Sequence, residues 1–362
     1  MKICIVIGTR PEIIKMSPII RACEKKHLDY LMIHTGQHYS YAMDKVFFKE
    51  LNLPNAKYNL DIGSHSHGEQ TGLMLEKIEK ILFKEKPDLV LVLGDTNSVL
   101  AGTLASTKMH IKVGHIESGL RSYDRYMPEE QNRTVVDHLA DYLFAPTENA
   151  KKILLGEGVP EGKIFVTGNT IVDAVFQNLE IAKKTVDILK KLNLEKQHYF
   201  TVTAHRPENV DRKEKLKGML EGFEKIYAEF KMPLVFSIHP RTKKMIGEFN
   251  LKIPEGTISI EPVSYLEFLQ LEANSRLILT DSGGIQEESC ILKIPCVTLR
   301  ENTERPETLT AGSNILAGTD PGRIFESVGK MVNAKKEWKN PFGDGNAATR
   351  IIEICEKIQQ LQ

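Results

Sequence analysis

The sequence has no excess of charge of either sign. Lys and Arg total 48 residues, and Asp and Glu also total 48, so no net field attracts a nucleic-acid backbone or an anionic membrane. No apolar run approaches the roughly 18 residues of a membrane span, and the first residues lack the apolar stretch of a signal peptide. We therefore expect a cytoplasmic protein that has neither nucleic acid nor membrane as a partner.

Cysteine is scarce and is not arranged for disulfides or zinc. The five cysteines are odd in number and form no C-x-x-C pair, which argues against a disulfide framework. The sequence also has no D-x-D motif, a spacing of acids that commonly holds a divalent metal. These absences predict reduced, mostly buried thiols and no metal site.

Length and periodicity predict two α/β domains. The 362 residues exceed what one hydrophobic core usually serves. Short β-branched runs alternate with stretches of helical period, and this rhythm restarts near residue 170. Because continuous apolar strands belong to parallel sheets covered by helices, we expect two Rossmann-like domains. We place them at 1–168 and 169–345, and assign 346–362 to an amphipathic helix that can pack back on the first domain.

The expected strands are short and apolar. They lie at 2–7, 30–35, 88–95 and 111–117 in the first half, and at 199–204, 233–238, 257–260, 276–281 and 295–300 in the second. Ligands bind outside the carboxyl ends of parallel strands. The polar residues that directly follow these strands are therefore the candidates for a site.

The first strand is followed by the motif G-T-R-P-E-I-I-K. Pro11 suits a first helical turn, and Gly8 permits a tight connection. Arg10 and Lys15 then lie near a helix N-terminus, where a diphosphate or carboxylate binds. The alternative interpretation is a charged loop on a solvated helix.

Carboxylates follow further elements of the first half. Asp95 and Glu117 come at the ends of two strands, and Glu129 and Glu130 lie in the first turn of a helix opened by Pro128. Clustered acids can have pKa values pushed apart, as proton donors and acceptors require. Each acid alone is also explained as a cap or as a favourable charge at a helix N-terminus. The prediction of proton chemistry depends on the convergence of three loops.

The second half contains a candidate phosphate site in the motif D-S-G-G-I-Q-E-E. The backbone N–H groups of Ser282, Gly283 and Gly284 can face a phosphate at the start of a helix. Glu288, about one turn further on, is within reach of a ribose diol. Arg305 offers another cation for a diphosphate, with an ordinary surface arginine as the alternative.

A histidine also follows a strand of the second half. His205 stands at the expected carboxyl end of 199–204, where it can act as a general acid or donate to a phosphate oxygen. A hydrogen-bonded structural histidine is the alternative. His239 repeats this layout, and for it the structural role is equally favoured.

The motifs GTRPEIIK, GDT, GHIESGLR, PEEQNR, TAHRPEN, DSGGIQEE and TERPE, in this order, resemble those of the non-hydrolysing UDP-N-acetylglucosamine 2-epimerases over essentially the whole chain. The resemblance implies a GT-B architecture, in which two Rossmann-like domains with parallel sheets face a central cleft, and a homodimer. It implies interconversion of UDP-GlcNAc and UDP-ManNAc without metal or nicotinamide cofactor. The implied route is anti elimination of UDP to 2-acetamidoglucal, followed by re-addition.

The resemblance also assigns roles by motif position. The catalytic positions are Asp95, Glu117, Glu129 and His205. The implied substrate contacts are Arg10, Lys15, Asp95, Glu117, His205, Phe268, Ser282, Gly283, Gly284, Glu288 and Arg305, with Phe268 beside the uracil. Whether Glu117 or Asp95 is the base that removes the C2 proton stays open. Glu129 is expected to be its partner acid, and His205 is expected to assist the departure and return of UDP.

One departure from the family concerns regulation. Some bacterial members bind a second UDP-GlcNAc as an activator through a G-Q-H segment and the arginine of an R-Q-T run. Gly36-Gln37-His38 is present here, but Glu69 stands in place of that arginine, and HRPEN replaces HRREN. The loss of two cations argues against this activation.

Two rival functions would keep the same nucleotide site. A hydrolysing epimerase or a GT-B glycosyltransferase would pass the sugar to water or to an acceptor, and a UDP-sugar sensor would only bind. A sensor needs the phosphate loop but not three carboxylates, so the acids favour proton chemistry at C2.

Overall fold

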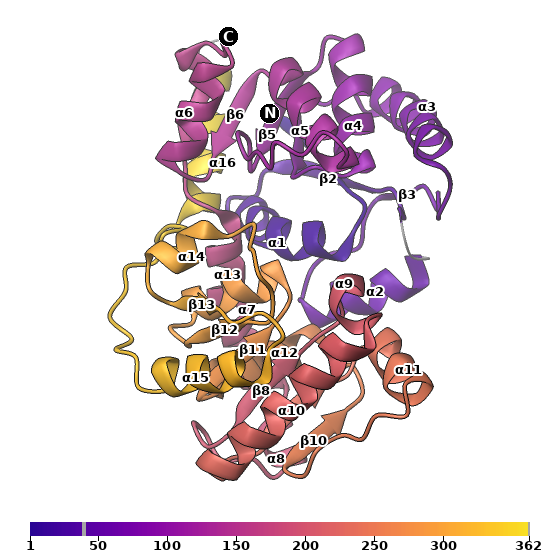
Figure 1. Cartoon of the computed structure of the whole chain (residues 1–362). Helices are drawn as coiled ribbons and strands as arrows, with labels where there is room; N and C mark the ends of the chain where they lie inside the picture. Colours follow the sequence, from indigo (N-terminus) through magenta and orange to yellow (C-terminus); the bar gives the residue numbers. More distant parts are fainter. Residues whose placement is uncertain (38–40, 361–362) are drawn as a thin grey trace. The chain divides into compact units, whose positions relative to one another are not determined.

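The computed structural model describes residues 1–37 and 41–360 and divides into two compact units (Figure 1). The first comprises Met1–Gln177 and the chain from Phe342 onward, and the second comprises Asn178–Pro341. The boundary therefore falls inside helix α7 (Thr170–Thr185) rather than at residue 168. The reason is that Asp173, early in α7, accepts hydrogen bonds from the N–H groups of Ala347 and Ala348, within the first unit.

The first unit contains a seven-stranded parallel sheet in the order β3-β2-β1-β4-β5-β6-β7. Its strands are β1 (Lys2–Ile7), β2 (Asp29–His34), β3 (Tyr58–Asn59), β4 (Leu89–Leu93), β5 (Lys112–Ile116), β6 (Tyr142–Ala145) and β7 (Ile164–Val166). Its helices are α1 (Arg10–Lys25), α2 (Tyr41–Glu50), α3 (His67–Glu85), α4 (Asn97–Lys108), α5 (Pro128–Leu139), α6 (Glu148–Gly156) and α16 (Ala347–Gln360), with a 3-10 turn at Glu161–Lys163. Helix α16 packs against α1.

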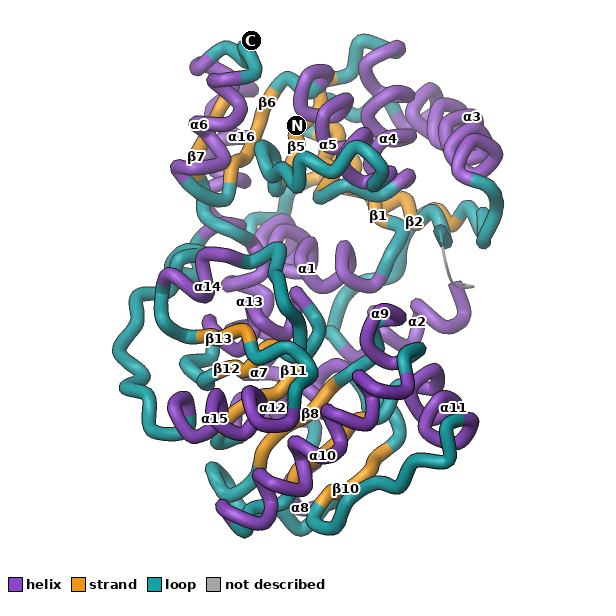
Figure 2. Tube along the Cα trace, in the orientation of Figure 1, coloured by secondary structure: helices purple, strands orange, loops and turns teal. Residues whose placement is uncertain are grey.

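The second unit repeats this plan with six parallel strands in the order β10-β9-β8-β11-β12-β13. They are β8 (Phe200–Thr203), β9 (Leu234–Ser237), β10 (Thr257–Ile260), β11 (Leu277–Thr280), β12 (Cys296–Thr298) and β13 (Asn314–Leu316). The helices are α8 (Ile188–Lys191), α9 (Pro207–Val210), α10 (Lys213–Phe230), α11 (Pro240–Glu248), α12 (Tyr265–Asn274), α13 (Gly283–Ile291), α14 (Pro306–Thr310) and α15 (Pro321–Met331). Figure 2 shows the strands of each unit flanked by helices.

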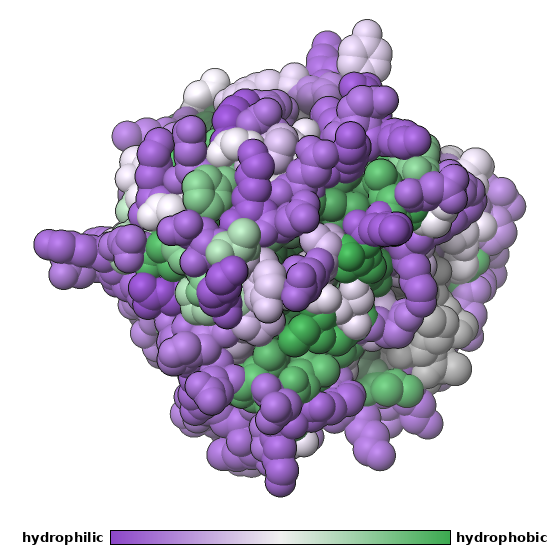
Figure 3. Space-filling view, turned by 60° about the horizontal axis from the view of Figure 1, so that its bottom comes forward, coloured by the Kyte–Doolittle hydropathy of each residue, from purple (hydrophilic) through white to green (hydrophobic). Residues whose placement is uncertain are grey.

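Apolar burial explains why these strands form. Every residue of Leu89–Leu93 and of Leu277–Thr280 is buried, as expected for parallel strands covered on both faces. All five cysteines are buried, which confirms the expectation of buried thiols. On the face drawn in Figure 3 hydrophilic side chains predominate. Of the helices in the described parts of the chain, none has the length and hydropathy of a membrane span.

The strand orders confirm the α/β class and the two Rossmann-like units. All the strands expected from the sequence are present, whereas β3, β6, β7 and β13, of two to four residues each, were not predicted. In each sheet the order reverses once, between β1 and β4 and between β8 and β11. Ligands bind outside the carboxyl ends of strands at such a reversal, and the candidates Arg10, Asp95, His205 and Ser282 follow these four strands.

Candidate active site

The first part of the site is an ion pair that follows β1 and β5. Helix α1 begins with a capping box between Thr9 and Glu12, which fixes the orientation of its first turns. Lys15 then places Nζ 2.6 Å from Oε1 of Glu117. Asn169 donates to the same oxygen from Nδ2 at 3.1 Å. The Glu117 carboxylate is only 7 % exposed, so these two donors fix its position.

The backbone at Glu117 is unusual. Its φ of +67° lies in the left-handed region, which few residues other than glycine adopt and which recurs at functional sites. Gly119 follows at φ +79°, and a Cβ there would lie 2.5 Å from the carbonyl oxygen of Ala150, so only glycine fits. A Cβ at Gly94 would lie 3.7 Å from Oε2 of Glu117. The segment that carries Asp95 therefore lies beside this carboxylate.

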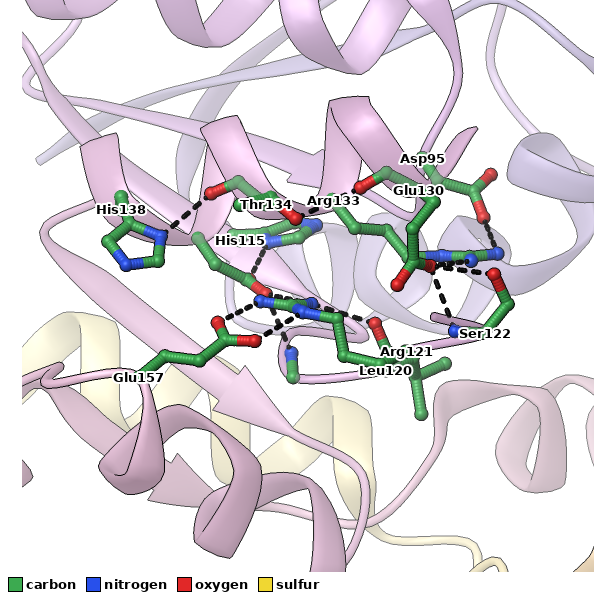
Figure 4. A network of polar contacts seen from close by, with 12 residues as sticks. Asp95, His115, Leu120, Arg121, Ser122, Glu130, Arg133, Thr134, His138 and Glu157 are labelled. Carbon is green, nitrogen blue, oxygen red and sulfur yellow. Dashed lines mark hydrogen bonds and ion pairs between the residues drawn. The ribbon is translucent and has the colours of Figure 1, made fainter. Parts of the chain in front are cut away.

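Asp95 belongs to a second network, drawn in Figure 4. Arg133 on α5 binds the Asp95 carboxylate and also donates to Oε2 of Glu130 at 2.8 Å. Glu130 further accepts the N–H groups of Ser122 and Tyr123, each at 2.9 Å. Burial raises the pKa of Glu130, but these hydrogen bonds outweigh it and hold the pKa below its usual range. Arg133 thus ties Asp95 to the loop that follows β5.

The sequence predicted Glu129 as the third carboxylate of this cluster. The structure places it in the first turn of α5, opened by Pro128 as expected, but half-exposed. Within the described chain the hydrogen-bonded carboxylate at this turn is that of the adjacent Glu130. The catalytic role of Glu129 stays a prediction.

A network of buried polar side chains contacts the ends of β4 and β5 (Figure 4). His115 lies 2.7 Å from Asp137 through Nδ1 and 2.8 Å from the carbonyl oxygen of Gly94 through Nε2. Asp137 also accepts the N–H of Gly119 at 3.0 Å and pairs with Arg121 at 2.7 Å. Although burial raises the pKa of Asp137, the contacts with His115 and Arg121 outweigh it and lower the pKa. The network joins the segments that carry Asp95 and Glu117.

In the second unit His205 directly follows β8, as predicted. Asp281 accepts hydrogen bonds from the backbone N–H groups of His205 and Arg206, each at 2.9 Å, and lies 3.1 Å from Nδ1 of the His205 ring. Burial raises the pKa of Asp281, but these partners bring it below its usual value. Asp281 therefore orients the imidazole.

His205 opens onto a cavity of about 230 Å³. The ring of His239 lies 5.8 Å from that of His205, and burial together with His205 lowers the pKa of His239. The cavity is lined by Thr203, Ala204, His205, Ser237, His239, Pro262, Phe268, Ser282 and Ile285. Three predicted residues, His205, Phe268 and Ser282, thus line one cavity.

Helix α13 begins at this cavity. Ser282 is its N-cap and Gly283 its first residue, as the sequence predicted. A Cβ on Gly283 or Gly284 would meet nothing closer than 3.7 Å. Space therefore lies over the first N–H groups of the helix, where an anion would bind.

Two other predicted residues of this unit have partners in the protein. Arg305 places Nε 2.6 Å from Oε1 of Glu287, so its charge is balanced in this structure. Glu288 is buried and accepts a hydrogen bond from the hydroxyl of Tyr265 at 3.2 Å.

The remaining predicted residues lie in the first unit. Arg10 is the first residue of α1, with its guanidinium 5.9 Å from the ring centre of Phe47. Gln37 accepts hydrogen bonds from Ser98, and Glu69 is exposed and pairs with His65. His38 lies outside the described residues. Over residues 1–37 and 41–360, no three His, Cys, Asp or Glu side chains group as metal ligands.

Several site residues were not predicted from the sequence. Arg133, Asn169 and Asp281 each contact a predicted residue. His115 bonds the carbonyl oxygen of Gly94, next to the predicted Asp95. All except Asn169 stand inside the recognised motifs, as the R of PEEQNR, the H of GHIESGLR and the D of DSGG. Their position in those motifs was the available signal, but it does not say which atom each one binds.

Two parallel α/β units with Rossmann-like strand orders are the fold of the GT-B class, and solved structures of GT-B-like epimerases match the chain. A family model described as UDP-N-acetylglucosamine 2-epimerase matches residues 21–356, and the chain belongs to this family. It is 59 % identical over 360 residues to a UDP-N-acetylglucosamine 2-epimerase of Methanocaldococcus jannaschii, covering 98 % of each chain.

Solved structures of relatives agree with this assignment. A crystal structure of the M. jannaschii UDP-GlcNAc 2-epimerase in complex with UDP-GlcNAc and UDP matches with a TM-score of 0.85 at 59 % identity. The match covers 99 % of this chain and 100 % of the chain in that structure. A UDP-GlcNAc 2-epimerase from Neisseria meningitidis bound to UDP-GlcNAc matches with a TM-score of 0.87 at 35 % identity, over 99 % and 100 % of the two chains.

Proposed function

We propose that this chain is a non-hydrolysing UDP-GlcNAc 2-epimerase that interconverts UDP-GlcNAc and UDP-ManNAc. The observation that carries the proposal is the pair of acids after β4 and β5. Glu117 is held by Lys15, and Asp95 is held by Arg133. A sugar transferase has no need of two oriented carboxylates for proton transfer, whereas inversion at C2 requires a proton to leave one face and return to the other.

The chemistry follows from the low acidity of the C2 proton. No carbonyl lies next to C2 in the sugar ring, so loss of this proton is assisted by departure of UDP from C1. A carboxylate, Glu117 or Asp95, takes the C2 proton, the C2–H electron pair forms the C1=C2 bond, and the C1–O bond breaks toward UDP. The 2-acetamidoglucal then receives a proton on the opposite face of C2, and UDP adds back to C1.

The second unit contributes the groups that bind the diphosphate and ribose of UDP. We assign the diphosphate to the N–H groups at Ser282, Gly283 and Gly284, since N–H groups at a helix N-terminus favour anions. Glu288 is assigned to the ribose hydroxyls. His205, oriented by Asp281, assists departure and return of UDP.

The remaining contacts are assigned by side-chain chemistry. Phe268 lies against the uracil, since it lines the cavity of the second unit. Arg10, Lys15 and Arg305 balance charge on the diphosphate, which requires Arg305 to exchange Glu287 for phosphate. Glu129 is the partner acid on the other side of the sugar. We also propose a homodimer, which multi-angle light scattering of the purified chain measures directly.

Product analysis separates this proposal from its rivals. Purified enzyme given UDP-GlcNAc labelled with ¹⁸O in the C1–O–P bridge is expected to form UDP-ManNAc and to scramble the label into the non-bridging β-phosphate positions, because released UDP can rotate before it adds back. Free ManNAc plus UDP would instead indicate a hydrolysing enzyme. If the enzyme forms no UDP-ManNAc and does not scramble the label, the chain is a binding protein and not an epimerase.

A further inference from the structure

An arginine–glutamate pair lies beside the first turn of α13. Arg300 comes shortly after β12, and its two Nη atoms lie 2.7 and 2.9 Å from the two carboxylate oxygens of Glu304. A Cβ built on Gly283, the first residue of α13, would lie 3.7 Å from Oε2 of Glu304. The Glu304 carboxylate is therefore at the edge of the space over the helix N-terminus, and the guanidinium of Arg300 is bonded directly to it.

The chain on both sides of Glu304 is anchored to α13. The hydroxyl of Thr303 donates to Oε1 of Gln286 at 2.5 Å. Nε of Arg305 lies 2.6 Å from Oε1 of Glu287. Gln286 and Glu287 are both residues of α13. These two contacts keep the backbone of Glu304 close to this helix, so its place there is fixed by the chain and not only by its own charge.

Glu304 brings negative charge to the place where a phosphate is expected. The hydrogen bonds from Arg300 lower the pKa of Glu304 to about 2, so this side chain is a carboxylate at neutral pH. A second cation, Arg206, follows His205 and places Nη2 3.7 Å from Oε1 of Glu304. Phosphate oxygens bind to arginine side chains and to the N–H groups of a helix N-terminus. The carboxylate thus lies among groups of the kind that bind a diphosphate.

The two members of the pair differ in their access to solvent. The Arg300 side chain is 8 % exposed, whereas the Glu304 side chain is 39 % exposed. Glu304 can therefore turn outward into water, while the guanidinium of Arg300 stays beside the helix. A carboxylate and a diphosphate would repel each other at this short range, because both are anions. Only one of them can occupy the position next to Arg300.

We propose that Arg300 is a ligand of the UDP diphosphate, and that Glu304 neutralises it in the free enzyme and leaves when UDP binds. The inference rests on the proposed function in assigning the diphosphate to the N-terminus of α13. Arg300 exchanges one anion for another, so its buried charge is balanced before and after binding. Opening the pair costs part of the binding free energy, so UDP binds less tightly than it would if Glu304 were neutral.

Two substitutions separate this exchange from a purely structural ion pair. Glu304→Gln keeps the shape and removes the competing charge, so we expect it to tighten UDP binding about fivefold, the upper end of what a partly exposed ion pair contributes. Arg300→Met should weaken UDP binding at least about tenfold, because hydrogen bonds to a charged oxygen are lost. Isothermal titration calorimetry measures both effects. UDP affinity that is unchanged or weaker in Glu304→Gln, or unchanged in Arg300→Met, would overturn the proposal.

Glu301→Gln is the matched control, since it removes one negative charge from the same loop but breaks an exposed pair with Arg323. It should leave UDP affinity unchanged, and tightening equal to that in Glu304→Gln would overturn the exchange as a general effect of charge. Glu304→Gln should also tighten binding far less when combined with Arg300→Met, because Glu304 acts by occupying Arg300. Full tightening in the double variant would contradict this coupling.

Uridine, which carries no phosphate, gives a readout that a structural role of the pair would not leave intact. Its affinity, measured by saturation-transfer NMR, should be the same in wild type, Glu304→Gln and Arg300→Met. Loss of uridine binding in Arg300→Met would assign Arg300 a structural role instead. If Arg300→Met does not fold, the tightening in Glu304→Gln still decides the proposal. Failure of the proposed function is distinguishable, because a chain that shows this pattern but forms no UDP-ManNAc refutes only the epimerase assignment.

Discussion

Lys15 Nζ lies 2.6 Å from Oε1 of Glu117, and the two residues are contributed by segments that follow different strands of one sheet. The contact joins the start of α1 to a residue at φ +67°. A left-handed backbone, a cation and the amide of Asn169 together hold one carboxylate in a single orientation. Such convergence on one oxygen is expected of a group that transfers a proton.

Replacement of this carboxylate should remove catalysis and spare the fold. We expect Glu117→Gln to lower kcat by about 10²- to 10⁴-fold, the usual contribution of a general base, while UDP binding changes little. Steady-state kinetics and calorimetry with UDP measure the two effects. Glu76→Gln, which breaks the exposed pair with Lys80, is the matched control and should leave kcat unchanged. A kcat near that of wild type in Glu117→Gln would transfer the role of base to Asp95.

Arg133 should couple Asp95 to the loop after β5. Arg133→Met removes donors from both Asp95 and Glu130, so we expect kcat to fall at least about tenfold and the free energy of unfolding to fall by about 2 kcal/mol. Arg133→Lys can bind only one of the two carboxylates well and should be intermediate. Urea unfolding and kinetics report the two quantities. Equal activity in all three proteins would show that Asp95 does not depend on this contact.

The buried histidine should matter far more than its exposed neighbour. His115→Leu removes the buried contacts of His115 with Oδ1 of Asp137 and with the carbonyl oxygen of Gly94, so we expect a loss of about 3 kcal/mol in stability and a reduced kcat. His138, exposed on α5 and bonded to Thr134 in the same helix (Figure 4), is the control. His138→Ala should change stability by less than about 0.5 kcal/mol. Similar effects of the two changes would contradict the supporting role of the network.

Glu12 should make stability depend on pH near neutrality. Burial raises its pKa to about 7, even though Thr96 and the N–H groups of Gly8 and Thr9 donate to it. A raised pKa favours the neutral acid in the folded state, so this contribution is complete below about pH 4.5 and is lost as the pH rises through about 7. We expect Glu12→Gln to remove a pH-dependent change on the order of 3 kcal/mol in unfolding free energy.

Urea unfolding of Glu12→Gln and wild type from pH 5 to 8 measures this difference. Glu79→Gln, which alters an exposed glutamate of α3, should keep the wild-type slope. A Glu12→Gln protein with the wild-type slope would show that Glu12 does not titrate in this range.

The strand ends that carry the site were predictable because an apolar, β-branched run there passes directly into a polar motif. The four unpredicted strands have two to four residues, too few to show a period. The boundary near residue 168 was less accurate because α7 continues across the junction, with Asp173 holding α16 in the first unit. Such contacts between distant segments leave no local pattern.

The choice between adjacent carboxylates was also beyond the sequence. Neighbouring residues of a helix differ by about 100° in direction, so Glu129 and Glu130 face different surroundings, and the motif PEEQNR does not tell which one turns inward. The structure places Glu130 against Ser122, Tyr123 and Arg133.

The most direct test of the account is proton NMR of the purified chain with UDP-GlcNAc in deuterated water containing EDTA. We predict UDP-ManNAc that carries deuterium at C2, since the proton removed by the enzyme exchanges with solvent before its return. The intact product would establish metal-independent epimerisation without hydrolysis. UDP-ManNAc that retains the C2 proton, or release of free ManNAc with UDP, would contradict the account.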